Sequence, residues 1–213
     1  MKLSVKKLVL VAMLAALAYM IMALVRIPVV LFLKYEPKDV VITIGGFLLG
    51  PMASFIISLV VSLIEMVTVS DTGPIGCLMN LLSTCSFACT AAFIYKKQHT
   101  LKGAVAGLAA GSLFMVGIML LWNWLVTPLY MGVERSAVED LLIPAFLPFN
   151  LLKAGLNSAL TLGLYKPLVT ALRKTGLVDT GAKSGSSKTG IYLFAAGLLI
   201  TCILLLLVMQ GKI

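Results

Sequence analysis

Charged residues are scarce in this sequence. Only 12% of its 213 residues are Asp, Glu, Lys or Arg, whereas 61% are hydrophobic and the mean hydropathy is +1.09. A water-soluble domain of this length does not need so much apolar surface, and several segments reach the roughly 20 apolar residues with which a helix crosses a bilayer. The composition therefore excludes a soluble globular domain and predicts an all-α integral membrane protein that is surrounded by the lipid bilayer.

Enzyme and nucleotide-binding motifs are also absent. The sequence has no G-x-x-x-x-G-K-[ST] loop, so the chain cannot hydrolyse ATP in the usual way, and it has no H-E-x-x-H or G-x-S-x-G motif. The single histidine, His99, follows Lys96 and Lys97 in a hydrophilic turn, where we expect it to be solvated. The net charge of +9 is spread over short loops and tails. We therefore expect neither an enzyme nor a nucleic-acid-binding protein.

The four cysteines do not form a metal-binding pattern. Cys77, Cys85, Cys89 and Cys202 all lie in apolar segments, and no two of them form a C-x-x-C pair. Cys85 and Cys89 are one helical turn apart but have no further thiol or histidine nearby. We expect all four to be buried as small hydrophobic residues, with neither a metal nor a cofactor.

Apolar runs divide the chain into membrane spans. A charged polar segment at 26–39 follows the first run, and the short second run ends at Gly50-Pro51. Gly103, Gly107 and Gly111 recur every four residues and predict close packing with a neighbouring helix, and Pro128 is expected to end that helix. A Gly/Ser/Thr/Lys-rich stretch divides the chain into a membrane domain of six helices at 1–174, a flexible cytoplasmic linker at 175–190 and an additional C-terminal transmembrane helix at 191–213. The predicted spans are 8–25, 40–49, 51–69, 75–95, 101–126, 142–172 and 191–209.

The basic residues indicate how the chain is oriented. If the N-terminus is cytoplasmic, most lysines and arginines fall on the inner side, and only a few, such as Arg26 and Arg135, fall outside. This bias follows the positive-inside rule and predicts a multi-pass protein of the cell membrane. It also places the acidic segments 36–39 and 134–140 outside, where an imported molecule would arrive.

One lysine lies where a charge is costly. Lys153 falls inside a long apolar run, and Asn150, Lys153 and Asn157 follow at i, i+3 and i+7, so a helix places them on one face. Such a stripe either joins helices or binds a polar ligand. An amide offers donors and acceptors, and lysine offers donors, which suits a flat molecule whose polar edge alternates carbonyls and ring nitrogens.

Further polar and aromatic residues lie near the outer ends of the spans. Trp122, Leu129 and Tyr130 are either an interfacial aromatic belt with a helix stop or the stacking wall of a site for a flat heteroaromatic ligand. Asn80 is either a ligand contact or a hydrogen bond between helices. Glu65 could pair with Lys153 across the bundle, because a compensated pair costs less than either charge alone.

Five stretches together resemble the substrate-binding S component of an energy-coupling factor (ECF) vitamin transporter, and most closely its riboflavin-specific member. They occur in the family's order and cover roughly residues 5–174. The stretches are Val11-Ala-Met-Leu-Ala-Ala-Leu-Ala18, Glu36-Pro-Lys-Asp39-Val40 leading to Gly50-Pro51, Gly73-Pro-Ile-Gly76 followed by Asn80, Asn123-Trp-Leu-Val-Thr-Pro-Leu-Tyr130, and Pro148-Phe-Asn-Leu-Leu-Lys153.

The resemblance implies a six-helix bundle that binds riboflavin from outside as a transported ligand. It also implies docking onto a transmembrane T component that is driven by two ABC-type ATPase subunits. By the same resemblance, Ala12 and Ala16 belong to the docking face. Tyr35, Glu36 and Asp39 line or gate the site, and Asn123, Asn150 and Lys153 contact the flavin.

The family core has six spans, so the linker and the helix at 191–209 are additions. Two other readings stay open, namely an S component for another small vitamin or precursor and a self-sufficient secondary transporter. The inverted repeats that are typical of many secondary transporters are not visible in the sequence.

Overall fold

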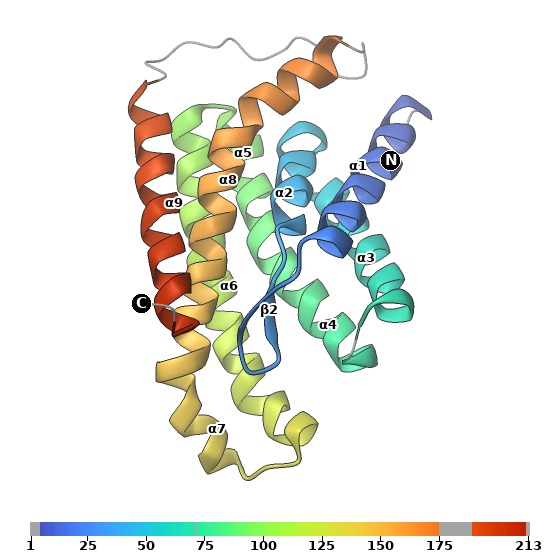
Figure 1. Cartoon of the computed structure of the whole chain (residues 1–213). Helices are drawn as coiled ribbons and strands as arrows, with labels where there is room; N and C mark the ends of the chain where they lie inside the picture. Colours follow the sequence, from blue (N-terminus) through green and yellow to red (C-terminus); the bar gives the residue numbers. More distant parts are fainter. Residues whose placement is uncertain (1–4, 71, 175–188, 212–213) are drawn as a thin grey trace.

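The protein is a bundle of helices with a small β-hairpin on one side (Figure 1). The computed structural model describes residues 5–70, 72–174 and 189–211. The elements of the first half are α1 (Val5–Leu24), β1 (Ile27–Val30), β2 (Leu33–Tyr35), α2 (Lys38–Leu49), α3 (Pro51–Thr68), α4 (Gly73–Thr84) and the π-helical η1 (Cys85–Cys89). The elements of the second half are α5 (Thr90–Gln98), α6 (Leu101–Met131), α7 (Arg135–Leu141), the π-helical η2 (Leu142–Phe146), α8 (Leu147–Lys174) and α9 (Thr189–Met209).

The predicted membrane spans agree with these helices. Within the described ranges, four helices are long and apolar enough to cross a membrane: α1, α3, α6 and the continuous rod Gly73–Gln98 that α4, η1 and α5 form together. The chain is therefore a multi-pass membrane protein. The start of α1 and the turn between α5 and α6 lie at one end of the bundle, and the hairpin points toward the end that carries α7 (Figure 1). We call these the inner and the outer end, in keeping with the orientation that the charges predict.

The prediction that Pro128 ends its helix is wrong, because α6 continues to Met131. The helix ends instead at Gly132, which has a left-handed φ of 65° and whose N–H donates to the Pro128 carbonyl. Proline removes one hydrogen bond of the ladder, and a membrane helix tolerates this loss where neighbouring elements cover the carbonyl that it frees. Glycine then supplies the backbone conformation that terminates the helix.

The expectation of an all-α chain needs one addition. The polar segment after α1 folds back on itself as an antiparallel hairpin in which Ile27 pairs with Tyr35 and Pro28 with Lys34. Leu31 lies in the turn with a left-handed φ of 50°. The residues just before and just after the hairpin in the sequence, up to the first turn of α2, thereby lie against the bundle.

Close helix contacts at the inner end confirm the prediction from the glycine spacing. A Cβ atom at Gly107 would lie 2.7 Å from the carbonyl oxygen of Ala91, and one at Gly111 would lie 2.5 Å from that of Phe87. Any side chain at these two positions would therefore separate α6 from η1 and α5. Gly103 instead lies against the side chain of Gln98, the last residue of α5.

The last apolar run forms the additional helix that the sequence predicts. Helix α9 runs beside α8 (Figure 1), and Cys202 of α9 lies so close to Gly155 of α8 that a Cβ at Gly155 would be 2.5 Å from its Sγ. The predicted linker at 175–190 falls, except for its last two residues, outside the described residues, as does Asp71.

Candidate ligand-binding site

The hairpin and the first turn of α2 bring charged residues into the interior. Glu36, Lys38 and Asp39 are all buried, and Lys38 and Asp39 are each only 1% exposed. Pro37 precedes α2, and its carbonyl accepts a hydrogen bond from the N–H of Val40 as the helix begins. The sequence predicts an outer loop at these positions, and the hairpin instead folds them between the helices.

A network of four charges joins this segment to α3 and α4. The Nε atom of Arg26 lies 2.8 Å from one oxygen of Glu36, and the Nζ atom of Lys38 lies 2.7 Å from the other. Lys38 also pairs with Glu65 of α3, and Arg26 Nη2 lies 3.6 Å from Glu65. Asn80 Nδ2 donates to Glu65 at 2.8 Å. Two cations and two anions make the network neutral, which offsets part of the cost of burying each charge.

A second network surrounds Asp39. Its carboxylate accepts hydrogen bonds from Thr84 Oγ1 at 2.7 Å and from Asn157 Nδ2 at 3.1 Å, and it lies 3.3 Å from Lys153 Nζ. Lys153 also donates to Ser83 Oγ at 3.1 Å. Helices α2, α4 and α8 are thereby joined around one neutral ion pair.

Tyr35 extends this second network to the hairpin. Its hydroxyl donates to Asn157 Oδ1 at 3.1 Å. Burial raises the pKa of Tyr35, and the nearby Asp39 carboxylate raises it further. The hydroxyl therefore keeps its proton at neutral pH and stays a donor.

The hypothesis that Glu65 pairs with Lys153 is wrong. Glu65 pairs with Lys38 and Arg26, and Lys153 pairs with Asp39. The charge pattern places Lys38 and Asp39 in an outer segment, and the family resemblance implies that Asp39 lines or gates the site. Neither identifies Asp39 as the partner of Lys153. Glu65 and Lys153, the two charges predicted to lie at membrane depth, are therefore not paired with each other. Each is paired with residues that lie between the end of α1 and the first turn of α2.

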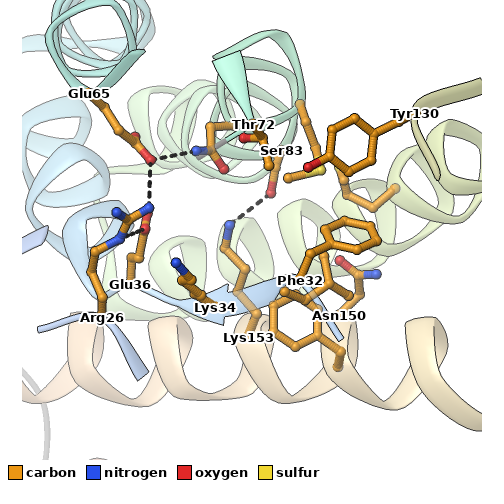
Figure 2. Close-up of a pocket in the computed structure, with 15 residues that line it drawn as sticks. Arg26, Phe32, Lys34, Glu36, Glu65, Thr72, Ser83, Tyr130, Asn150 and Lys153 are labelled. Carbon is orange, nitrogen blue, oxygen red and sulfur yellow. Dashed lines mark hydrogen bonds and ion pairs between the residues drawn. The ribbon is translucent and has the colours of Figure 1, made fainter. Parts of the chain in front are cut away.

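A cavity of about 160 Å³ opens between the hairpin, α3, α4, α6 and α8 (Figure 2). Its wall has two kinds of surface. The polar residues that line it are Arg26, Lys34, Glu36, Glu65, Thr72, Asn80, Ser83, Asn150 and Lys153. The apolar and aromatic ones are Phe32, Leu33, Met79, Met119, Tyr130 and Phe149.

The structure brings six of the predicted site residues to this cavity: Glu36, Glu65, Asn80, Tyr130, Asn150 and Lys153. The Tyr130 ring lies edge-on to Phe32, with 5.5 Å between their centroids. Asn150 donates to the Phe146 carbonyl at 2.7 Å. Trp122 lines a small adjacent cavity that shares Phe32 and Tyr130 with the first.

Four other predicted residues, Tyr35 among them, do not line this cavity. Asn123 is fully buried, donates to the Met119 carbonyl and accepts from Thr127 Oγ1, so both ends of its amide are used within α6. Asp39 acts on the cavity only through Lys153. Leu129 is 82% exposed and lies on the outer surface of α6.

Several residues that line the cavity are not among those predicted from the sequence. Phe32 and Arg26 lie in the hairpin segment, which the sequence shows only as a polar stretch with prolines. Ser83 is predictable from the sequence as part of a polar helix face, because Asn80, Ser83 and Thr84 follow at i, i+3 and i+4. Met79, Met119 and Phe149 look like any other apolar residue of a membrane helix.

The predicted docking residues lie on the surface. Ala12 and Ala16 are exposed on α1, and Leu8, Met13 and Met20 of the same helix are exposed as well.

Four free cysteines are present, and no cluster of potential metal ligands occurs within the residues that the structure describes.

Comparison with known proteins gives consistent matches. The family model described as the substrate-specific component of ECF transporters matches residues 6–165. The riboflavin transporter RibU of Staphylococcus aureus (strain TCH60) is 28% identical over 178 residues, covering 79% of this chain and 93% of that protein. The riboflavin transporter FmnP of Bacillus subtilis (strain 168) is 28% identical over 161 residues, covering 70% and 84%.

A solved structure shows the same fold. It is described as that of the S component of a bacterial ECF transporter, and it superposes with a TM-score of 0.68 at 27% identity. The superposition covers 79% of this chain and 98% of that one.

Proposed function

This chain belongs to the family of substrate-specific S components of ECF transporters, and from that premise we propose that it is the riboflavin-binding subunit of an ECF-type importer. The family is one of transporter components, and on this proposal the chain is not an enzyme. It captures riboflavin at the outer end of the bundle and holds it in the cavity as cargo rather than as a cofactor.

The two-sided wall of the cavity is the observation that carries this proposal. Riboflavin has a flat tricyclic ring with an alternating edge of carbonyls and ring nitrogens, and a chain of hydroxyl groups. Phe32, Tyr130 and the methionines offer faces for the ring. Asn80, Asn150 and Lys153 offer donors and acceptors for the polar edge and the hydroxyls. The names of both curated relatives support the same ligand.

Residues next to the cavity hold those contacts in place. Asp39 fixes the ammonium group of Lys153 at 3.3 Å, and Ser83 accepts from the same group. Asn123 bonds the backbone of Met119, which lines the cavity, so we assign it to positioning this part of the wall. In the proposed site, Asn123 contacts the ligand only if its side-chain amide breaks these hydrogen bonds. Trp122 and Tyr130 form the outer rim of the site.

On this proposal, the energy for transport comes from other subunits, because the chain has no phosphate-binding loop with which to hydrolyse ATP itself. On this proposal it docks onto a transmembrane T component with two ABC-type ATPase subunits. The exposed face of α1 supports this role, because Ala12 and Ala16 follow at four-residue spacing and allow close approach of a second helix. The N-terminus then lies in the cytoplasm and the hairpin faces the outside of the cell membrane.

Flavin binding by the purified full-length protein tests the proposal. Riboflavin added to the protein in detergent should lose its fluorescence with a saturating dependence on protein concentration. Phe32→Leu should weaken binding about three- to tenfold, the range that follows from the loss of one aromatic contact. Phe114→Leu, on the exposed surface of α6, is the matched control and should leave the affinity unchanged.

Two results would contradict the proposal. If the wild-type protein leaves riboflavin fluorescence unchanged, the ligand is wrong, and an S component for another vitamin becomes the better reading. If cells that contain this chain without the ATPase subunits accumulate riboflavin against a gradient, the protein is a secondary transporter.

A further inference from the structure

Helix α9 lies beyond the region that the family model matches, which ends at residue 165. It packs along α8, where Gly155 allows the Sγ atom of Cys202 to approach closely. Ala195 and Cys202 are both buried, whereas Ile200, Ile203 and Val208 are exposed. The helix therefore has one face against the bundle and another that is suited to lipid.

The C-terminal end of α9 reaches the β-hairpin. The side-chain amide of Gln210 donates to the backbone carbonyl of Pro28 in β1 at 2.8 Å, a contact between residues 182 positions apart. Cys202 belongs to the same buried apolar cluster as Val29 and Leu33 of the hairpin, with Leu206 packed against it. Helix α9 thus contacts the β-hairpin that follows α1.

The hairpin is also one wall of the cavity. Arg26, Phe32, Leu33, Lys34 and Glu36 all come from this segment and line the space (Figure 2). Small-molecule sites bury most of the surface of their ligand. A ligand held here is therefore covered in part by the hairpin, and the position of the hairpin affects access to the cavity.

We propose that α9 holds the hairpin against the bundle, with Gln210 as a positioning residue, and so sets the rates at which riboflavin enters and leaves without touching it. This inference rests on the proposed function. Neither Gln210 nor Pro28 is among the residues that line the cavity, and the bond between them is exposed.

The expected kinetic signature separates this role from ligand contact. The bond to Pro28 stabilises the closed hairpin whether the site is empty or occupied. Its loss should therefore raise association and dissociation rates by a similar factor and leave the equilibrium Kd nearly unchanged. Loss of a ligand contact would instead raise the dissociation rate and the Kd together.

The first test is stopped-flow flavin quenching with the full-length Gln210→Leu variant. Both rates should rise roughly two- to tenfold, the factor that follows from the loss of one hydrogen bond. Gln98→Leu, at the exposed end of α5, removes the same side chain at the inner end and should change neither rate. Unchanged rates in Gln210→Leu, or a higher Kd with an unchanged association rate, would overturn the inference.

The opposite change gives a second test. Pro28→Cys combined with Gln210→Cys places one thiol on each of the two segments that the hydrogen bond now joins, and a disulfide formed between them on oxidation should slow both rates until a reductant is added. Gln210→Cys alone is the control, because oxidation should not affect it. If the oxidised double variant exchanges riboflavin as fast as the reduced one, α9 does not restrain the hairpin.

A third measurement does not depend on riboflavin. Amide hydrogen exchange of residues 26–36 in the ligand-free full-length protein should be faster in Gln210→Leu than in the wild type. If the wild-type protein fails to bind riboflavin but shows this difference, the proposed ligand is wrong and the restraint by α9 stands. If the wild type binds riboflavin and the hairpin exchanges equally in both proteins, only the inference about α9 fails.

Discussion

The outer end of the bundle, with its hairpin, is stabilised differently from the inner end, where α5 meets α6. At the outer end, buried charges from the hairpin segment, α3 and α8 are held by partners that lie far away in the sequence. At the inner end, Gly107 and Gly111 let backbones touch, and Phe47, Tyr95 and Tyr165 form an aromatic cluster. The inner end therefore depends on size and shape, whereas the outer end depends on charge compensation.

The largest expected effect breaks the charge compensation at the outer end. Asp39→Asn and Lys153→Met each leave one buried charge unpaired and should each lower the free energy of unfolding by roughly 3–5 kcal/mol. The double variant removes both charges and should be more stable than the two separate losses predict. Chemical unfolding in detergent measures these differences.

The same variants separate stability from ligand binding. The double variant should regain stability but not riboflavin affinity, because Lys153 lines the cavity and Asp39 does not. Lys97→Met, an exposed lysine at the end of α5, is the control for the loss of a lysine. Strictly additive losses in the double variant would show that the ion pair contributes nothing.

A smaller effect is expected where helices touch at the inner end. Gly111→Ala adds a Cβ that would lie 2.5 Å from the Phe87 carbonyl oxygen, and it should destabilise the protein by about 1–3 kcal/mol. Gly117→Ala on the same helix has nothing within 4 Å, so it should be neutral or stabilising by up to about 1 kcal/mol. Thermal unfolding of both variants checks the opposite signs, and equal shifts would contradict the role of close packing.

The smallest effect concerns the aromatic cluster. The hydroxyl groups of Tyr95 and Tyr165 lie 2.6 Å apart, and Tyr95→Phe should cost about 1 kcal/mol through the loss of that hydrogen bond. Riboflavin affinity should not change, because the pair lies at the inner end. Tyr19→Phe, whose hydroxyl bonds Thr68 at an exposed position, should cost less. A drop in riboflavin affinity in Tyr95→Phe would show that the two ends are coupled.

Much of the fold follows from local pattern. Apolar length locates the helices, and the spacing of Gly107 and Gly111 predicts a contact that the structure confirms. The end of α6 was misplaced at Pro128, because proline tolerance depends on the surroundings of the helix end. The hairpin was missed, because its strands are only four and three residues long and lie in a polar segment.

The candidate site was predictable only in part. The stripe of Asn150, Lys153 and Asn157 marks a polar helix face, because a helix brings those positions together whatever surrounds it. The partner of Lys153 was assigned wrongly to Glu65, since Asp39 enters the interior only when the hairpin folds back. Leu129 and Tyr130 are neighbours in sequence, yet the helix turns one outward and the other toward the cavity.

The sequence by itself determined three properties of this chain: that it is embedded in a bilayer, which segments span that bilayer and which helix faces are polar. These properties depend on length, composition and helical periodicity, and each can be read from residues close to one another. Only the tertiary structure decided which charges neutralise each other, how the hairpin lines the cavity and that the last helix contacts β1. Each of these depends on contacts between residues tens to nearly two hundred positions apart, which no local pattern encodes.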